Sequence, residues 1–182
     1  IQYDFPMGWS ELNGVHNRTD YDLSRHQEYS GKSMTYVDPV TQERYIPYVI
    51  EYSIGADRLM LATLSEAYDE ETLENGEVRN VMRFHPAIAA YKAAVLPLQK
   101  GLAPQAKELL QKLKKRFLVT YDEAGSIGKR YRRQDEIGTP YCLTVDFDTL
   151  QDGTVTVRDR DTMEQVRMTA DEVVAFLTEK CA

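Results

Sequence analysis

The chain has 182 residues, of which 42% are hydrophobic and 28% charged, and its formal net charge is −7. This composition is typical of a soluble protein with one large or two small domains, and no apolar run is long enough to span a membrane. Its two cysteines, Cys142 and Cys181, form no disulfide framework or zinc motif, which favours a reducing compartment such as the cytoplasm.

The charge is distributed unevenly along the chain. Residues 1–88 contain 15 acidic and 7 basic side chains, whereas residues 89–182 contain 14 and 15. Within residues 100–133 there are 10 basic and 3 acidic side chains, a net of +7. Such asymmetry favours a nucleic-acid partner, with an ordinary solvated face as the alternative.

The first half of the chain predicts short strands around one helix. Leu59–Tyr68 is apolar on nearly every side, which predicts a buried helix. The other expected elements, in chain order, are an extended segment at 6–17, an irregular polar segment at Asn17–Ser30, strands at Met34–Val37 and Tyr45–Glu51, and an exposed acidic loop at Asp69–Glu77.

The pattern changes near residues 86–92, where strands and helices begin to alternate. The expected strands are Ala93–Leu98, Phe117–Tyr121, a half-buried strand at 141–147, Thr154–Arg158 and Gln165–Met168. The expected helices are one with apolar residues from Leu102 to Phe117, a helix at Ile127–Ile137 capped by Ser126 and ended by Gly138, and a last helix that opens with a Thr169–Glu172 capping box. This order predicts an α/β domain with a mixed sheet.

One short stretch indicates a ligand site. In "IEYSIGADRLML", strand alternation places Glu51 and Ser53 on one face, about 7 Å apart, where they could hold an ammonium group. Gly55 allows close approach of a ligand, and Arg58 could stack on a base or reach phosphate. Glu11 could hold magnesium beside a triphosphate. These residues favour an amino acid and ATP; a structural Arg–Glu pair at a turn is the alternative.

Three motifs carry a resemblance to a known family. "GADRLML" after a strand resembles motif 3 of the class II aminoacyl-tRNA synthetases. Together with "FPMGWSELNGVHNRTDYDLSRHQEYSGK" and the segment "YDEAGSIGKRYRRQDEIGTPYCLTVDFDTLQDGTVTVRDRDTMEQVRM", it is similar to the dimeric type of glycyl-tRNA synthetase over nearly the whole chain. The resemblance implies the C-terminal part of an antiparallel-sheet catalytic domain at 1–88, and a mixed-sheet α/β anticodon-binding domain at 89–182.

The resemblance also implies roles for individual residues. It implies ATP binding, with Mg²⁺ held through ATP by Glu11, and glycine binding, with Glu51 taking the ammonium group and Arg58 lying against the adenine. The implied ATP residues are Glu11, Leu12, Gly55, Ala56, Asp57 and Arg58, and the implied glycine residues are Glu51, Tyr52, Ser53, Ile54 and Gly55. Tyr52 departs from the family, which often has proline there.

Two further motifs of the family are not found in this sequence: motif 1, a dimer-interface element, and motif 2, whose arginine holds the α-phosphate. We therefore expect the chain to be the C-terminal part of a homodimeric, cytoplasmic glycine–tRNA ligase that acts on glycine, ATP and tRNA(Gly), inactive by itself and with no membrane partner. The alternative is a non-catalytic, synthetase-like accessory protein that binds nucleic acid.

The basic segment predicts where RNA would bind. Lys112–Arg116 ends a helix, where positive charge suits the helix dipole. Lys129, Arg130 and Arg133 open the next helix, where positive charge is disfavoured. We therefore expect these three side chains to point to solvent and contact tRNA phosphates, with pairing to Asp146 or Asp148 as the alternative. Tyr131 and Tyr141 could stack on bases, although a place in the core is favoured.

Overall fold

The computed structural model describes residues 1–182 and divides into two compact units, Ile1–Ser65 and Glu66–Ala182. Helix α2 (Ala56–Ala67) carries the chain from the first unit into the second. The division predicted at 88/89 concerns catalytic and anticodon-binding parts; it falls inside the second unit and stays a prediction.

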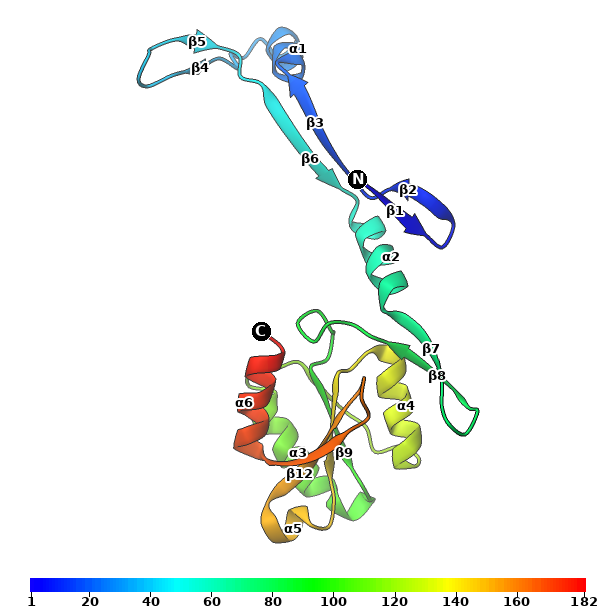
Figure 1. The fold of residues 1–182 in the computed structure, drawn as a ribbon. Helices are drawn as coiled ribbons and strands as arrows, with labels where there is room; N and C mark the ends of the chain where they lie inside the picture. Colours follow the sequence, from blue (N-terminus) through cyan, green and yellow to red (C-terminus); the bar gives the residue numbers. More distant parts are fainter. The chain divides into compact units, whose positions relative to one another are not determined.

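The first unit is built from two-stranded antiparallel pieces (Figure 1). β1 (Gln2–Phe5) pairs with β2 (Gly8–Glu11), and β3 (Asn13–Thr19) pairs with β6 (Val49–Ile54). A short hairpin joins β4 (Tyr36–Val37) to β5 (Arg44–Tyr45). The strand predicted at 34–37 is therefore shorter, and the one predicted at 45–51 is divided into β5 and β6, of which β6 continues to Ile54.

Two expectations for this unit are wrong. The polar segment predicted to be irregular continues β3 to Thr19 and then forms helix α1 (Tyr21–Ser30), which buries no residue and ends at Gly31 with a left-handed φ of 68°. The helix predicted to be buried is α2, in which Leu59 is 46% and Met60 59% exposed. Two-stranded pieces offer no second layer that could cover an apolar helix.

The second unit contains one mixed sheet of five strands in the order β10-β9-β11-β12-β13. β9 (Ala93–Pro97), β10 (Val119–Tyr121) and β11 (Tyr141–Val145) are parallel, and β12 (Thr154–Asp159) and β13 (Gln165–Thr169) continue the sheet in antiparallel register. The predicted mixed-sheet α/β fold is confirmed.

Helices cover both faces of this sheet. η1 (Lys100–Leu102), α3 (Ala103–Leu113) and α6 (Ala170–Lys180) lie on one face, and α4 (Ile127–Ile137) lies on the other; α5 (Thr149–Asp152) follows β11 (Figure 1). Val95 and Leu143 join the core under α3 and α6, whereas Leu96 and Cys142 pack toward α4. All five residues of β11 are buried, so the expectation of a half-buried strand is wrong.

Of the three features predicted at helix termini, two are confirmed and one is not. The Thr169 hydroxyl accepts the Glu172 amide, and the Glu172 carboxylate accepts the Thr169 amide, so the predicted capping box of α6 is confirmed. Gly138 ends α4 with a φ of 80°, as expected, but Ser126 makes no side-chain cap hydrogen bond.

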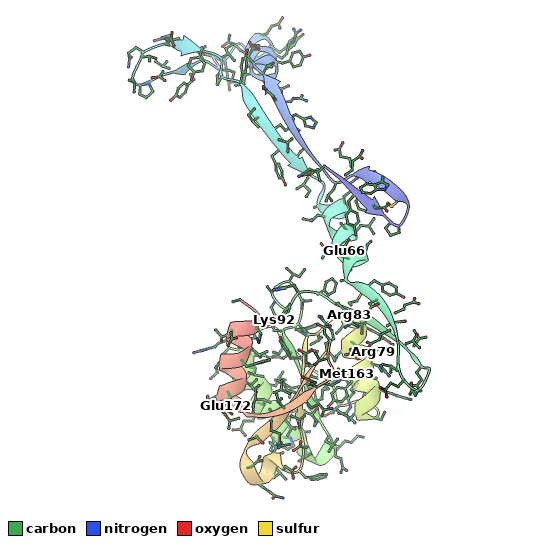
Figure 2. The ribbon with its side chains drawn as sticks, viewed as in Figure 1. Glu66, Arg79, Arg83, Lys92, Met163 and Glu172 are labelled. Carbon is green, nitrogen blue, oxygen red and sulfur yellow. The ribbon has the colours of Figure 1, made fainter.

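The segment predicted to be an acidic loop is a hairpin of the second unit. β7 (Tyr68–Thr72) pairs with β8 (Val78–Met82), and only residues 73–77 form the turn. Beyond it, Lys92 Nζ donates to the carbonyls of Pro86, Ala87 and Ala89 at 3.0, 2.8 and 2.9 Å (Figure 2). This ammonium group fixes the connection between the hairpin and β9.

Candidate functional site

A cavity in the first unit brings together two stretches that are distant in sequence. It has a volume of about 450 Å³ and is lined by Ser10, Glu11, Leu12, Ser53, Ile54, Gly55 and Arg58. The first three belong to β2 and the residue after it, and the others to the end of β6 and the first turn of α2. Six of the seven lining residues are among those that the family resemblance implies.

Arg58 is held in place across this cavity. Its Nη1 donates to the Ser10 hydroxyl at 2.9 Å and to the backbone carbonyl of Glu11. A Cβ at Gly55 would meet the Cβ, Cγ and Cδ atoms of Arg58 at 3.7 to 3.8 Å, which is ordinary contact, so the fold by itself leaves room for a small side chain there. Sequence reasoning missed Ser10, because a serine next to Glu11 gives no signal until the fold brings Arg58 to it.

The predicted glycine residues divide into two groups. Ser53, Ile54 and Gly55 line the cavity, whereas Glu51 and Tyr52 do not. The Glu51 carboxylate lies 3.4 Å from Arg18 Nε, and both side chains are about two-fifths exposed, at 40% and 43%. Ala56 and Asp57, predicted to contact ATP, also lie outside the lining.

Arg18 stands at an irregular point of its strand. The register of β3 against β6 shifts between Asn17 and Thr19, and Thr19 has a positive φ of 52°. A bulge of this kind re-aims a side chain and is frequent next to active sites. Arg18 also pairs with Asp22 of α1 at 2.9 Å, so it joins the helix to Glu51.

The basic side chains of α4 do not all point to solvent. Arg130 is 3% exposed, and its guanidinium donates to the carbonyls of Pro97 and Leu98 at the end of β9. Arg133 pairs with Asp122, at 2.9 Å from Nε and 2.5 Å from Nη2. The expectation of three solvent-facing cations is therefore wrong for Arg130, and Arg133 is already neutralised. Lys129 is exposed.

The two carboxylates that the sequence suggested as alternative partners of the α4 cations, Asp146 and Asp148, lie next to another arginine, Arg167. Asp146 accepts from Arg167 Nη1 at 2.7 Å and from the Thr149 amide and Thr156 hydroxyl. Burial alone would raise the pKa of Asp146, but Arg167 and these hydrogen bonds lower it to about 2. Arg167 also lies 4.0 Å from Asp148. The carboxylates of Asp146 and Asp148 are therefore neutralised by Arg167 of β13 rather than by the basic side chains of α4.

The two candidate stacking tyrosines belong to the core. Tyr131 bonds the Thr144 hydroxyl at 2.7 Å, and its ring lies 4.8 Å from the Arg158 guanidinium. Tyr141 is 5% exposed and meets Phe176 edge to face. The interpretation of both as core residues is confirmed.

A buried charge cluster attaches the β7–β8 hairpin to α4 (Figure 2). Asp135 of α4 is fully buried and accepts from Arg79 Nε at 2.9 Å and from Arg158 Nη1 at 2.9 Å. Arg79 continues to Glu71 at 2.7 Å and to the carbonyl of Arg160. No local pattern in the sequence predicts this cluster, since its members lie far apart along the chain.

The structure shows no group of three or more His, Cys, Asp or Glu side chains placed to hold a metal ion. Both cysteines are free thiols, Cys142 buried and Cys181 half-buried. Every helix is too short or too polar to cross a bilayer.

A comparison with protein-family models matches a part of the second unit. Residues 92–180, which comprise the five-stranded sheet and its helices, match the model described as "Anticodon binding domain". The described chain is also similar in fold, with a TM-score of 0.72 and 19% identity, to the RNA binding domain of threonyl-tRNA synthetase from Cryptosporidium parvum, covering 98% of this chain and 42% of that one.

The similarity to curated relatives extends over the whole chain. The chain is 63% identical over 180 residues to the glycine–tRNA ligase of Clostridium kluyveri and 64% identical over 182 residues to that of Geobacillus kaustophilus. The two alignments cover 99% and 100% of this chain. The chain spans only about two fifths of the length of these relatives, 39% and 40%. The predicted resemblance to glycyl-tRNA synthetases that carry an anticodon binding domain is confirmed.

Proposed function

We propose that this chain forms part of a glycine–tRNA ligase, which activates glycine with ATP and transfers it to tRNA(Gly). The observation that carries the proposal is the cavity in which Ser10–Leu12 meets Ser53–Arg58. Two stretches that family resemblance assigns to one nucleotide and one amino acid meet there around a fixed guanidinium. The similarity to named glycine–tRNA ligases supports the same conclusion.

The cavity suits the chemistry of an amino acid next to a nucleotide. The Arg58 guanidinium is planar, and Ser10 and the Glu11 carbonyl fix it where it can lie against an adenine. The Glu11 carboxylate suits the Mg²⁺ that accompanies ATP. Ser53 and the backbone through Gly55 suit glycine, and Glu51, two residues before Ser53, would take its ammonium group once released from Arg18.

The same cavity explains why we expect the isolated chain not to form glycyl adenylate. Attack of the glycine carboxylate on the α-phosphate places negative charge on the phosphate oxygens, which requires positive groups aimed at them. Arg58 is the only basic side chain that lines the cavity. Because Arg58 is assigned to the base, another part of the ligase must hold the phosphate.

For the second unit we propose recognition of the tRNA(Gly) anticodon by residues 92–180. Lys129, exposed in the first turn of α4, is the predicted phosphate contact that the fold leaves free. We place the ligase in the cytoplasm as a homodimer, in line with free thiols and with the family resemblance.

The test is glycine-dependent pyrophosphate exchange in the full-length ligase that contains this chain. Glu51→Ala should abolish exchange, because it removes a charge-assisted bond to the ammonium group. Arg58→Ala should chiefly raise the KM for ATP. Glu43→Ala, an exposed carboxylate on the turn before β5, is the matched control and should leave exchange unchanged. Exchange at the wild-type rate with Glu51→Ala would contradict the assignment.

The alternative is a synthetase-like accessory protein that binds nucleic acid without catalysis. Such a protein has no need of an arginine fixed by Ser10 in a cavity with one carboxylate and two hydroxyl groups. If the full-length wild-type protein were such an accessory protein, it would bind tRNA but would show no glycine-dependent pyrophosphate exchange. The same assay therefore separates the two functions.

A further inference from the structure

The structure sorts the basic side chains of residues 100–133 into paired and free ones. Four of the ten are already occupied: Lys112 by Asp171 at 2.7 Å, Arg130 by two carbonyls, Arg132 by Glu77 at 3.7 Å and Arg133 by Asp122. Lys107 lies over the Tyr121 ring, at 5.8 Å. The remaining free cations are Lys100, Lys114, Lys115, Arg116 and Lys129.

Three of these free cations are consecutive and share one turn. Lys114, Lys115 and Arg116, here termed the basic turn, follow the last residue of α3, and all three are exposed. No acidic side chain pairs with them, and Leu118 beside them is 62% exposed. The basic turn is thus the densest unpaired positive charge in a chain of net charge −7.

The backbone of the basic turn is fixed from both sides. The Lys114 amide donates to Leu110 at 2.9 Å, and the amides of Arg116 and Phe117 both donate to the Leu113 carbonyl at 3.0 Å. Leu113 is fully buried, and Phe117 packs against the main core. Three long cationic side chains therefore project from a rigid base, which lowers the entropy that a ligand must remove on binding.

The basic turn and Lys129 lie at opposite ends of the parallel strands. The basic turn precedes β10, and so stands at the amino ends of the parallel strands, whereas α4 begins after β10 at their carboxyl ends. A single nucleotide cannot contact both ends of the parallel strands. A ligand that reaches the basic turn as well as α4 must be an extended polyanion.

We propose that the basic turn is a second RNA-contacting surface, which binds backbone phosphates of the tRNA outside its anticodon. The inference rests on the proposed RNA function of this unit. Lysine and arginine that neutralise phosphates supply salt-dependent affinity without reading sequence. The alternative explanation is that the three charges only complement the dipole of α3, which requires no RNA.

The experiment measures binding of a tRNA(Gly) transcript to the full 182-residue chain between about 50 and 200 mM salt, the range over which phosphate contacts reveal themselves. Replacing Lys114, Lys115 and Arg116 by glutamine should lower the slope of log K against log salt by about two to three units, close to one per lost contact. The matched control replaces Lys32, Lys100 and Lys107 by glutamine, an equal change in charge, and should change the slope by less than about one unit.

Each outcome bears on a separate claim. A triple variant whose slope equals that of the control overturns the basic turn as an RNA surface, while the proposed RNA function stands. A wild-type chain with no salt-dependent tRNA binding overturns both. The same titration with heparin, a polyanion without bases, serves as a second probe. If the triple variant binds heparin more weakly but keeps the wild-type tRNA slope, the basic turn binds another polyanion, which also contradicts the inference. Should the triple variant unfold, Lys115→Gln alone should still lower the slope by about one unit.

Discussion

Asp135→Ala is expected to destabilise the second unit strongly. Asp135 is fully buried and accepts from Arg79 and Arg158, at 2.9 Å in each case. Its removal leaves two guanidinium groups in the interior, of which Arg79 has no solvent exposure at its side chain. Breaking a buried ion pair on one side costs about 3 to 5 kcal/mol, because the remaining charge stays desolvated.

The remaining contacts set where in that range the loss should fall. Arg79 keeps Glu71, at 2.7 Å, and Arg158 keeps the Tyr131 ring, at 4.8 Å. Two arginines are left with one carboxylate, so we expect the loss to be near the middle of that range, about 4 kcal/mol. In a domain of this size that corresponds to a fall in Tm of roughly 10 to 20 °C.

Urea unfolding followed by circular dichroism, with calorimetry for Tm, measures this loss. Asp171→Ala is the matched control: its carboxylate pairs with Lys112 at 2.7 Å, but its side chain is 90% exposed. Exposed pairs contribute about 0 to 1 kcal/mol, so the control should lose little. If Asp135→Ala proved no less stable than Asp171→Ala, the buried cluster would not be what attaches the hairpin to α4.

Three smaller predictions follow from groups described above. Because the pKa of Asp146 is lowered to about 2 in the folded state, its contribution to stability is complete above about pH 5 and disappears as the pH falls toward 2; Asp146→Asn should remove that part of the acid sensitivity, about 2 to 3 kcal/mol, in acid unfolding curves. Burial raises the pKa of Cys142 to about 12, so iodoacetamide mass mapping should modify Cys181 first, and equal rates would contradict this. Thr169→Ala should lower stability by about 0.5 to 2 kcal/mol in urea, while Thr178→Ala, with its hydroxyl on the Val174 carbonyl late in α6, should have less effect.

The sequence predicted the second unit well because its signals are local. The flanking residues Ser126 and Gly138 predicted the bounds of α4, 127–137, and the Thr169–Glu172 pair identified the start of α6. Capping, turn chemistry and periodicity all act within a few residues. Where they agree, as they do here, the fold follows from the sequence.

The burial of charged side chains could not be predicted in the same way. Arg130 and Arg133 occur in a run of exposed-looking cations, yet one is buried against carbonyls of β9 and the other pairs with Asp122. Such partners come from other elements, so no periodicity announces them. For the same reason Asp69–Glu77 suggested a loop, whereas Asp69 and Glu71 on β7 pair with Arg83 of the same unit.

The candidate cavity was predicted in part. The motifs named Glu11, Leu12 and the stretch from Ser53 to Arg58, most of which the fold brings to one cavity. Ser10 needed the structure, because only the fold shows which hydroxyl meets Arg58. The positions of Glu51 and Arg18 likewise depend on the register of β3 against β6, which the sequence leaves open.

The central claim, that the chain carries the anticodon-reading part of a glycine–tRNA ligase, is tested most directly by one binding comparison. The dissociation constant of the 182-residue chain is measured for a tRNA(Gly) transcript and for the same transcript with its anticodon bases replaced, at one salt concentration. Base stacking and hydrogen bonds contribute about 1 to 3 kcal/mol per base, so the account predicts at least about fivefold weaker binding of the altered transcript. Equal affinity for the two transcripts would contradict it.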